Sequence, residues 1–307
     1  MTEIQTIAVP QARLGSGSQY HSENYLDCFN RFFGFSESPF NNTPDPNFFF
    51  MSQHHHEALT SLNFGIYQRR GFLVLTGEVG AGKTTLCRQF LAQLSPEIKT
   101  AVILNSRVSG THLLSSVVQD FGIIPRGKGR RGLYEALAAF LLDGINRNQN
   151  ACLIIDEAQC LNLRVLEEIR LLSNLETSKQ KLIQIVLMGQ PELRDLLKKP
   201  SLRQLRQRIG VYVHLRGFTP NETRDYILHR LSCVSRGESK IAISTDVFER
   251  IHEATRGTPR LINTACDRIL MAAYAHQTSH ITLDVARDAF EEISFICAQE
   301  KGEGGSR

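Results

Sequence analysis

The sequence predicts an α/β fold, a five-stranded parallel sheet with helices on both faces, followed by a small C-terminal helical domain. Short apolar runs rich in β-branched residues alternate with helical patterns over the first two thirds of the chain. The first four runs are hydrophobic almost throughout, as strands buried on both faces must be. Because helices separate the runs, we expect parallel strands joined by right-handed crossovers. The five runs are residues 71–76, 100–105, 151–156, 185–189 and 211–215.

The first run leads into a glycine-rich loop, Gly77-Glu-Val-Gly-Ala-Gly-Lys-Thr84, and a helix follows it. This G-x-x-x-x-G-K-[ST] spacing between a strand and a helix is typical of a loop that wraps the phosphates of a nucleoside triphosphate. The glycines let the backbone turn sharply, and the helix N-terminus directs its dipole at the anion. Lys83 supplies positive charge to the terminal phosphates. The predicted nucleotide-binding residues of this segment are Gly77, Glu78, Val79, Gly80, Ala81, Gly82, Lys83, Thr84 and Thr85.

The third run ends in two acids, Asp156 and Glu157, which a buried strand presents at its carboxyl end. Asp156, with the Thr84 hydroxyl, is suited to hold Mg²⁺. Glu157 is suited to orient and deprotonate an attacking water. A solvated pair of acids at a strand end is the alternative, and the loop upstream favours the catalytic interpretation. We therefore predict an ATPase with ATP and Mg²⁺ as cofactors.

The pattern changes after Gly217, where helical segments predict a small separate domain. Thr219 and Pro220 are a suitable N-cap and first residue for the first of these helices. The short segment 279–282 either caps the last helix or adds a small strand. The helices are expected at residues 222–236, 245–255, 259–276 and 283–298.

The composition is that of an ordinary intracellular globular protein. The chain has 307 residues, and its net charge of +4 is too small to imply nucleic acid by itself. Its seven scattered cysteines fit reduced thiols. No run reaches the ~18 apolar residues of a membrane span, and the N-terminus lacks the pattern of a secretory signal, so we expect a cytoplasmic protein.

We expect a disordered tail (1–22), a nucleotide-binding α/β domain (23–217), a helical lid (218–298) and a flexible tail (299–307).

These motifs, in this order, resemble those of the AAA+ ATPases over most of the chain, from about Phe32 to Ile293. The family's sheet order implies that the strand ending at Gln190 lies between the first and third strands. Gln190, in Leu187-Met-Gly-Gln-Pro, then stands where the family keeps a polar sensor near the γ-phosphate. A turn residue before Pro191 is the alternative.

The resemblance also implies two roles for arginine. The segment 202–209 contains Arg206 and Arg208, with Arg203 third, as candidates for a residue that reaches the nucleotide of a neighbouring subunit. A solvated basic helix face is the alternative. Arg260, in Gly257-Thr-Pro-Arg, resembles the sensor-2 arginine that bends back onto the γ-phosphate. A neighbour's nucleotide is needed for the first role, so we expect a ring or filament of identical chains.

The segment before the loop is similar to the ExeA/GspA group of general secretion ATPases and to its short, MshM-like form. It contains Phe33-Gly-Phe-Ser-Glu-Ser-Pro-Phe and then the aromatic segment 43–50. These aromatics are expected to pack on the core and to cover one side of the adenine. The resemblance implies that ATP hydrolysis drives assembly of a secretion or type IV pilus (MSHA-like) machine, and that a membrane component of that machine holds the protein at the inner membrane.

The same core also resembles, more distantly, the transposition ATPases of the TnsC and TniB type, which implies duplex DNA as an alternative partner. The basic loop 126–131 fits contacts with phosphates but also fits a solvated loop. Residues 54–56, three histidines at a helix start, are interpreted as a solvated helix face rather than a metal site. A nucleotide switch that acts as a scaffold without hydrolysis is a third interpretation.

Overall fold

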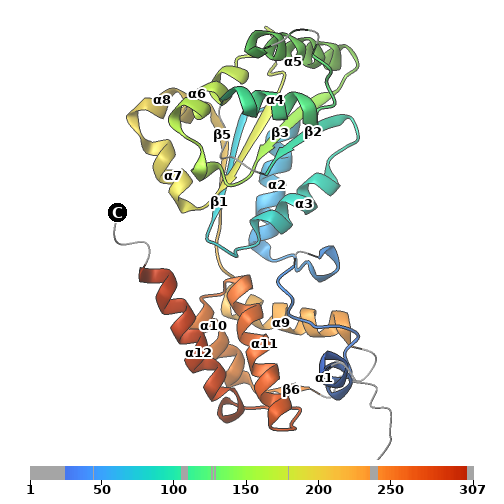
Figure 1. Ribbon diagram of the computed structural model, residues 1–307, viewed down its shortest axis with the longest axis vertical. Helices are drawn as coiled ribbons and strands as arrows, with labels where there is room; N and C mark the ends of the chain where they lie inside the picture. The colour runs from blue at the N-terminus through green and yellow to red at the C-terminus, as the bar shows by residue number, and fades with distance from the viewer. Residues whose placement is uncertain are drawn as a thin grey trace, which may run out of the picture.

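Figure 1 shows the computed structural model, which describes residues 25–302 apart from 44, 105–109, 126, 128, 179 and 236–240, with side chains described as far as Ile293. An α/β domain and a helical lid follow one another along the long axis, and β5 leads from the first into the second. The tail expected at the N-terminus, two residues of the basic loop and the last residues of the C-terminal tail lie outside the described residues.

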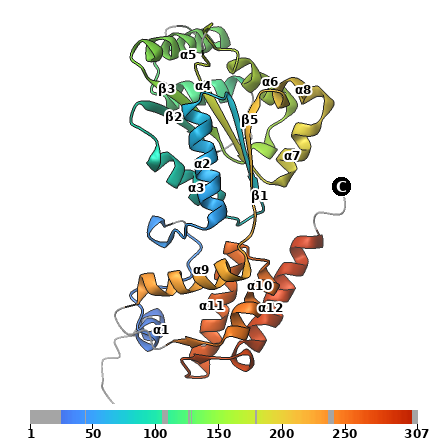
Figure 2. The ribbon, with the colours of Figure 1, turned by 180° about the vertical axis from the view of Figure 1, so that it is seen from behind.

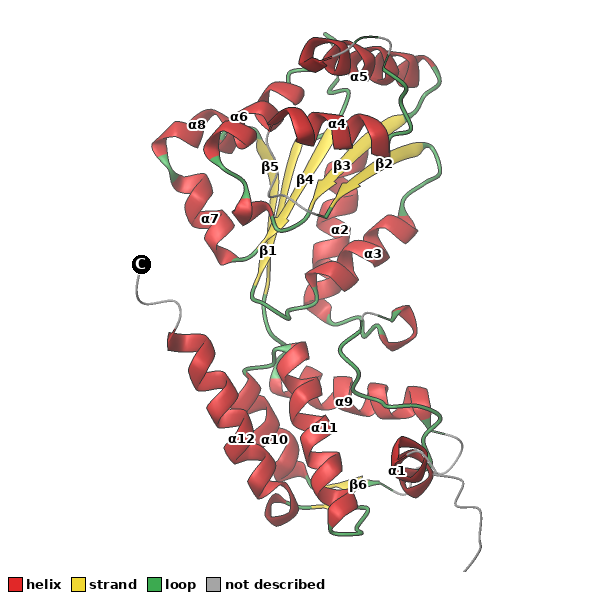
Figure 3. Cartoon of the chain, viewed as in Figure 1, coloured by secondary structure: helices red, strands yellow, loops and turns green. Residues whose placement is uncertain are grey.

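The α/β domain is built on the parallel sheet that the sequence predicts (Figure 3). Its strand order is β2-β3-β4-β1-β5, so β4 lies between β1 and β3 as the resemblance implies. β1 and β4 are buried along their whole length, whereas β5 alternates between exposed and half-buried residues because it is an edge strand. The strands are β1 (Phe72–Gly77), β2 (Ile98–Ile103), β3 (Asn150–Ile155), β4 (Gln184–Gly189) and β5 (Ile209–Leu215).

Helices cover both faces of the sheet. On one face, apolar side chains of α2 and α3, such as Leu62 and Phe90, pack on Leu73 of β1. On the other face, α4 to α8 pack on side chains such as Leu153 of β3. The helices are α2 (Gln53–Tyr67), α3 (Lys83–Gln93), α4 (Gly110–Asp120), α5 (Gly129–Asn146), α6 (Leu163–Leu172), α7 (Pro191–Lys198) and α8 (Arg203–Arg206).

The lid is helical, as predicted. Thr219 caps its first helix in a capping box with Glu222, and Pro220 occupies the first position. The segment around residue 280 forms a short strand that pairs with another, so the strand alternative is correct. None of the described helices is long and apolar enough to cross a membrane. The elements are α9 (Pro220–Val234), β6 (Ala242–Ile243), α10 (Thr245–Thr255), α11 (Pro259–Ala275), β7 (His280–Ile281) and α12 (Leu283–Gly302).

The N-terminal segment, α1 (Tyr25–Phe33) and the 3₁₀ turn η1 (Pro46–Phe48), packs on the lid (Figure 2). Its phenylalanines belong to the same buried cluster as α9 and α11. The amide of Ser36 donates to the carbonyl of Val234 at 2.8 Å, which fixes the segment along α9. The expected domain bounds group this segment with the α/β domain. Most of its phenylalanines pack in the core of the lid instead, whereas Phe49 packs against the core of the α/β domain.

Two backbone segments cross closely where the sheet enters the lid. The amide of Phe218 donates to the carbonyl of Gly257 at 2.8 Å. A Cβ on Gly217 would lie 2.3 Å from the carbonyl oxygen of Arg256, and one on Gly257 would lie 2.0 Å from that of Phe218. Glycine is therefore required at both positions. This crossing holds the start of α9 next to the start of α11, which carries Arg260.

Candidate active site

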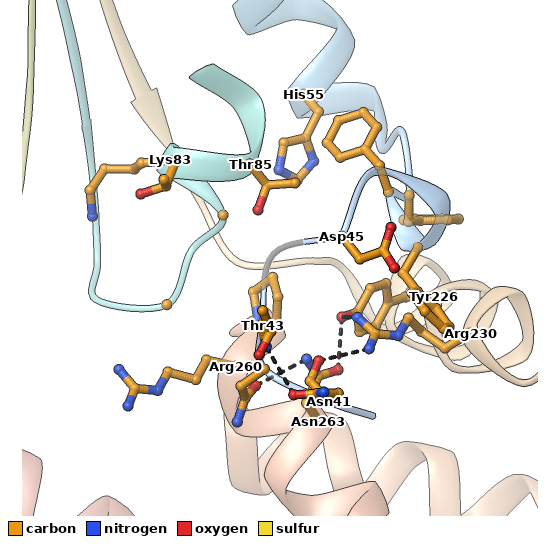
Figure 4. A pocket seen from close by; sticks show the side chains of 18 of the residues that line it. Asn41, Thr43, Asp45, His55, Lys83, Thr85, Tyr226, Arg230, Arg260 and Asn263 are labelled. Carbon is orange, nitrogen blue, oxygen red and sulfur yellow. Dashed lines mark hydrogen bonds between the residues drawn. The ribbon is translucent and has the colours of Figure 1, made fainter. Parts of the chain in front are cut away.

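A cavity of about 480 Å³ lies where the carboxyl edge of the sheet faces the lid (Figure 4). Its walls come from the glycine-rich loop and strand ends, from the segment before α2, and from α9 and α11. Of the predicted residues, those that line it are Val79, Gly80, Gly82, Lys83, Thr84, Thr85, Glu157, Gln190 and Arg260. Gly77, Glu78, Ala81, Asp156, Arg206 and Arg208 are not part of its lining.

The glycine-rich loop has the conformation that its sequence requires. Gly80 and Gly82 have positive φ angles of 76° and 91°, which side chains rarely adopt. A Cβ on Gly80 would lie 2.5 Å from the Cβ of Arg260, and one on Gly82 would lie 3.2 Å from Nε2 of His55. The missing side chains therefore let the lid arginine and a helix α2 histidine approach the loop.

Lys83, at the start of α3, is buried with its ammonium group against the loop. Its Nζ donates to the carbonyl of Gly77 at 2.7 Å and to that of Glu78 at 2.9 Å. Burial lowers the pKa of Lys83, and the nearby carboxylates of Glu157 and Asp156 oppose that shift. The site thus holds a positive charge beside two acids at the end of the sheet.

The two acids that follow β3 differ in burial and in their contacts. Asp156 is 8% exposed, accepts the amide of Glu157 at 2.9 Å and hydrogen-bonds to the Thr84 hydroxyl. Burial raises the pKa of Asp156. A carboxylate and a hydroxyl held together in this way supply the hard oxygen atoms that Mg²⁺ takes from protein, so these two residues fit the ion. Glu157 follows with left-handed backbone angles (φ 50°, ψ 37°) and enters the cavity wall.

Gln190 follows β4 and contacts Glu157. Its Nε2 donates to Oε2 of Glu157 at 3.3 Å. It also occupies the N-cap position of α7, before Pro191, but its side chain makes no capping hydrogen bond. A third residue, Gln159, joins the two, because its Nε2 donates to the same Glu157 oxygen and its Oε1 accepts the amide of Gln190. No sequence motif pointed to Gln159.

Arg260 brings the lid to the loop. It is the second residue of α11, and its backbone amide donates to the carbonyl of Gly80 at 3.3 Å. The side chain is exposed and lines the cavity below the glycine-rich loop (Figure 4). A guanidinium at the first turn of a lid helix is thus placed to contact an anion bound by the loop.

The other arginine candidates lie away from this cavity. Arg206 donates to the carbonyls of Leu197 and Lys198 at the end of α7, at 3.1 and 2.9 Å. Arg208 donates to the hydroxyl of Ser173 at 3.1 Å. The side chain of Arg203 is exposed and has no hydrogen-bond or ion-pair partner within the described part of the chain. Within one chain, Arg206 and Arg208 are therefore held by hydrogen bonds, whereas the side chain of Arg203 is not.

His55 corrects the interpretation of the histidine triplet as a solvated face. It is 4% exposed, lines the cavity and contacts the rings of Phe49 and Phe218, whose centroids are each 5.7 Å from that of its imidazole. Its Nδ1 is 2.7 Å from the hydroxyl of Ser52, the N-cap of α2. Burial lowers the pKa of His55 to about 4, so the ring is neutral. Among the described residues there is no group of three acids, histidines or cysteines that suits a metal.

A buried arginine organises the lid end of the cavity. Arg230 of α9 is 6% exposed, and its guanidinium donates to the carbonyls of Pro39 and Asn41 at 2.6 and 2.8 Å. It also donates to the hydroxyl of Tyr226, which in turn donates to Asn263 at 2.7 Å (Figure 4). This network joins the N-terminal segment to α9 and α11.

Comparisons with known proteins agree with this geometry. A family model described as an AAA domain matches residues 66–197. The chain is 39% identical to general secretion pathway protein A of Aeromonas hydrophila over 265 residues, which are 86% of this chain and 48% of that protein. Residues 66–197 of this chain therefore match an AAA domain. It spans about half of the length of the curated relative that it matches.

Solved structures share the fold of this chain. Cdc6p from Pyrobaculum aerophilum has a TM-score of 0.61 at 19% identity, covering 84% of this chain and 71% of that one. The ORC2 protein of Aeropyrum pernix has a TM-score of 0.58 at 20% identity, with coverages of 83% and 71%. The RuvB Holliday junction branch migration motor of Thermotoga maritima has a TM-score of 0.53 at 18% identity, with coverages of 78% and 69%. At these identities the likeness concerns the fold alone.

Proposed function

We propose that this AAA+ chain is a Mg²⁺-dependent ATPase that binds ATP between the α/β domain and the lid and hydrolyses it there. The observation that carries the proposal is one cavity lined by Lys83, Glu157, Gln190 and Arg260. A phosphate-binding loop, an acid beside it and a lid arginine supply anion binding, proton acceptance and charge compensation in one place.

Glu157 is the residue proposed to activate water. It and Asp45 are the acids that line the described cavity, and Glu157 is the one near Lys83, at the phosphate end. Its carboxylate is proposed to accept the proton of a water aligned with the terminal phosphate. Lys83 and Arg260 would offset the charge of the phosphate oxygens, and Thr84 and Asp156 would hold the metal. Bound Mg²⁺ supplies further compensation of the phosphate charge.

We further propose that identical chains assemble in a ring or filament, so that an arginine of one chain reaches the nucleotide of the next. Arg206 and Arg208 already donate to carbonyl and hydroxyl oxygens of their own chain. Arg203 has no such partner within the described residues and is exposed, so it becomes the first candidate. A guanidinium suits this role because it is always charged and binds phosphate oxygens as a fork.

In the cell, we propose that hydrolysis drives assembly of a secretion or type IV pilus machine through a membrane component. The name of the relative from Aeromonas hydrophila supports a role in secretion. The DNA alternative has little support from Arg130 and Arg131, which lie in the first turn of α5 rather than in a loop. Their guanidinium groups pair with Glu168 and Glu135, respectively. Measuring ATPase activity with and without duplex DNA separates the two roles. Strong stimulation by DNA that falls steeply with salt would favour the DNA-bound regulator.

The test of the catalytic proposal is Glu157→Gln, compared with the exposed control Glu249→Gln on α10. The first variant is expected to bind ATP with near-normal affinity and to release phosphate at least ~100-fold more slowly, because the amide cannot accept a proton from water. The control is expected to match the wild type. Normal turnover by Glu157→Gln would contradict the assignment of the base.

A further inference from the structure

Gln159 connects the ends of two strands at the site. It lies in the 3₁₀ turn η2 (Ala158–Cys160), two residues beyond Glu157 and half-buried. Its Nε2 donates to Oε2 of Glu157 at 2.5 Å, and its Oε1 accepts the backbone amide of Gln190 at 3.1 Å. One side chain therefore spans from the acid after β3 to the residue after β4.

The orientation of the Gln159 amide is fixed by its partners. A backbone N–H can only donate, so the atom facing the amide of Gln190 is the oxygen, and the NH₂ group must face Glu157. The path of the side chain crosses Gly189, where an added Cβ would lie 2.6 Å from Oε1 of Gln159. Glycine at the end of β4 thus leaves the space that Gln159 occupies.

The Glu157 carboxylate receives two amide donors on the same oxygen, from Gln159 and from Gln190. Two donors with fixed origins restrict the rotation of a carboxylate that would otherwise sample several rotamers. Gln190 itself is held by Gln159 through its backbone amide. Loss of Gln159 therefore removes one donor directly and loosens the other.

We infer that Gln159 is a positioning residue for hydrolysis, which sets the carboxylate of Glu157 and couples it to Gln190. The inference rests on the proposed function, because it assumes that Glu157 acts on water. Gln159 does not line the cavity, so its effect reaches the nucleotide through Glu157. Removing it is expected to slow the chemical step and to leave ATP binding in place.

The test is Gln159→Glu, measured for kcat, KM and direct ATP affinity. Glutamate has the same shape and keeps an acceptor for the amide of Gln190, but it cannot donate to Glu157 when ionised and it repels that carboxylate. We expect kcat to fall about 10- to 100-fold, with KM and the ATP dissociation constant within about twofold of wild type. Gln119→Glu on the exposed side of α4 makes the same charge change and is expected to have no effect.

A second variant displaces the Gln159 side chain without substituting that residue. Gly189→Ala places a methyl group 2.6 Å from Oε1 of Gln159, too close for that side chain to keep its position, so it is expected to lower kcat in the same way. Melting curves of both variants control for loss of folding. Wild-type kcat in Gln159→Glu, or equal losses of kcat and ATP affinity, would overturn the inference. Normal turnover by Glu157→Gln would instead refute the proposed function, and the two failures are thereby distinguished.

Discussion

The two ends of the cavity are built in different ways. The phosphate end comes from one contiguous loop, Gly77 to Thr84, and from the residues that directly follow β3 and β4. The lid end is assembled from the segment before α2, from α9 and from α11, and Arg230 donates to a carbonyl 191 positions away along the chain. The first depends on local backbone geometry, and the second depends on tertiary packing. We therefore expect the phosphate end and the lid end to respond differently to mutation.

Lys83→Ala tests the phosphate end and has the largest expected effect. Removing the ammonium group should weaken ATP binding at least ~100-fold, about 3 kcal/mol, because a charge-assisted contact with phosphate is lost. Isothermal titration with ATP and Mg²⁺ measures the change. Lys99→Ala, an exposed lysine on β2, is the matched control and should bind as the wild type does. Normal affinity in Lys83→Ala would mean that the loop is not the phosphate site.

Arg230→Met tests the lid end, where the expected effect is on stability. The change leaves the carbonyls of Pro39 and Asn41 without their buried donor, which should cost about 2–4 kcal/mol in the free energy of unfolding. Arg224→Met, an exposed arginine on the same helix, should cost less than ~0.5 kcal/mol. Urea unfolding of both variants measures the difference. Equal stability of the two would show that the buried network contributes nothing.

The pH dependence of stability tests the buried histidine between the two ends. The pKa of His55 falls from 6.5 when exposed to about 4 in the folded chain, so the unfolded state binds more protons between these values. Stability should therefore fall as the pH is lowered, by about 2 kcal/mol between pH 7.5 and pH 5 from this residue. The difference between wild type and His55→Gln in unfolding free energy, followed over this range, isolates the contribution. A difference that does not change with pH would place His55 in contact with water.

Glu222→Gln has the smallest expected effect and tests how the ends are joined. The Glu222 carboxylate accepts the amide of Thr219 at the start of α9 and the amide of Gln53 at the start of α2. The neutral amide keeps one acceptor oxygen, so the loss should be about 1 kcal/mol of unfolding free energy. Glu249→Gln is the exposed control and should be neutral. A stability equal to that of the control would mean that this joint is solvated.

Short-range patterns, such as the all-apolar strands, predicted the sheet and the lid helices. The strand order was implied by the resemblance to the AAA+ ATPases and not by those patterns. The glycine-rich loop was recognisable from its spacing, and Lys83, Glu157 and Gln190 of the predicted site line one cavity. The glycine positions of the loop could be interpreted from the sequence because a positive φ angle, such as those of Gly80 and Gly82, directly favours glycine.

The lid end was not predictable in the same way. His55 lies in a run of three histidines with nothing to single it out, and its burial depends on Phe49 and Phe218 from distant segments. Arg230 appears in the sequence as one more basic residue on a helix, and its partners lie near the other end of the chain. The aromatic residues within 25–50 are recognisable in the sequence as apolar. Their pattern does not indicate whether they pack in the core of the lid or in that of the α/β domain.

Titration of the wild-type chain with a non-hydrolysable ATP analogue and Mg²⁺ tests the central claim most directly. We predict saturable binding of one nucleotide per chain, and a rise in the melting temperature because only the folded cavity binds the ligand. The experiment uses folded protein at a concentration high enough to detect micromolar affinity. If it then shows neither binding heat nor a thermal shift, the account is contradicted.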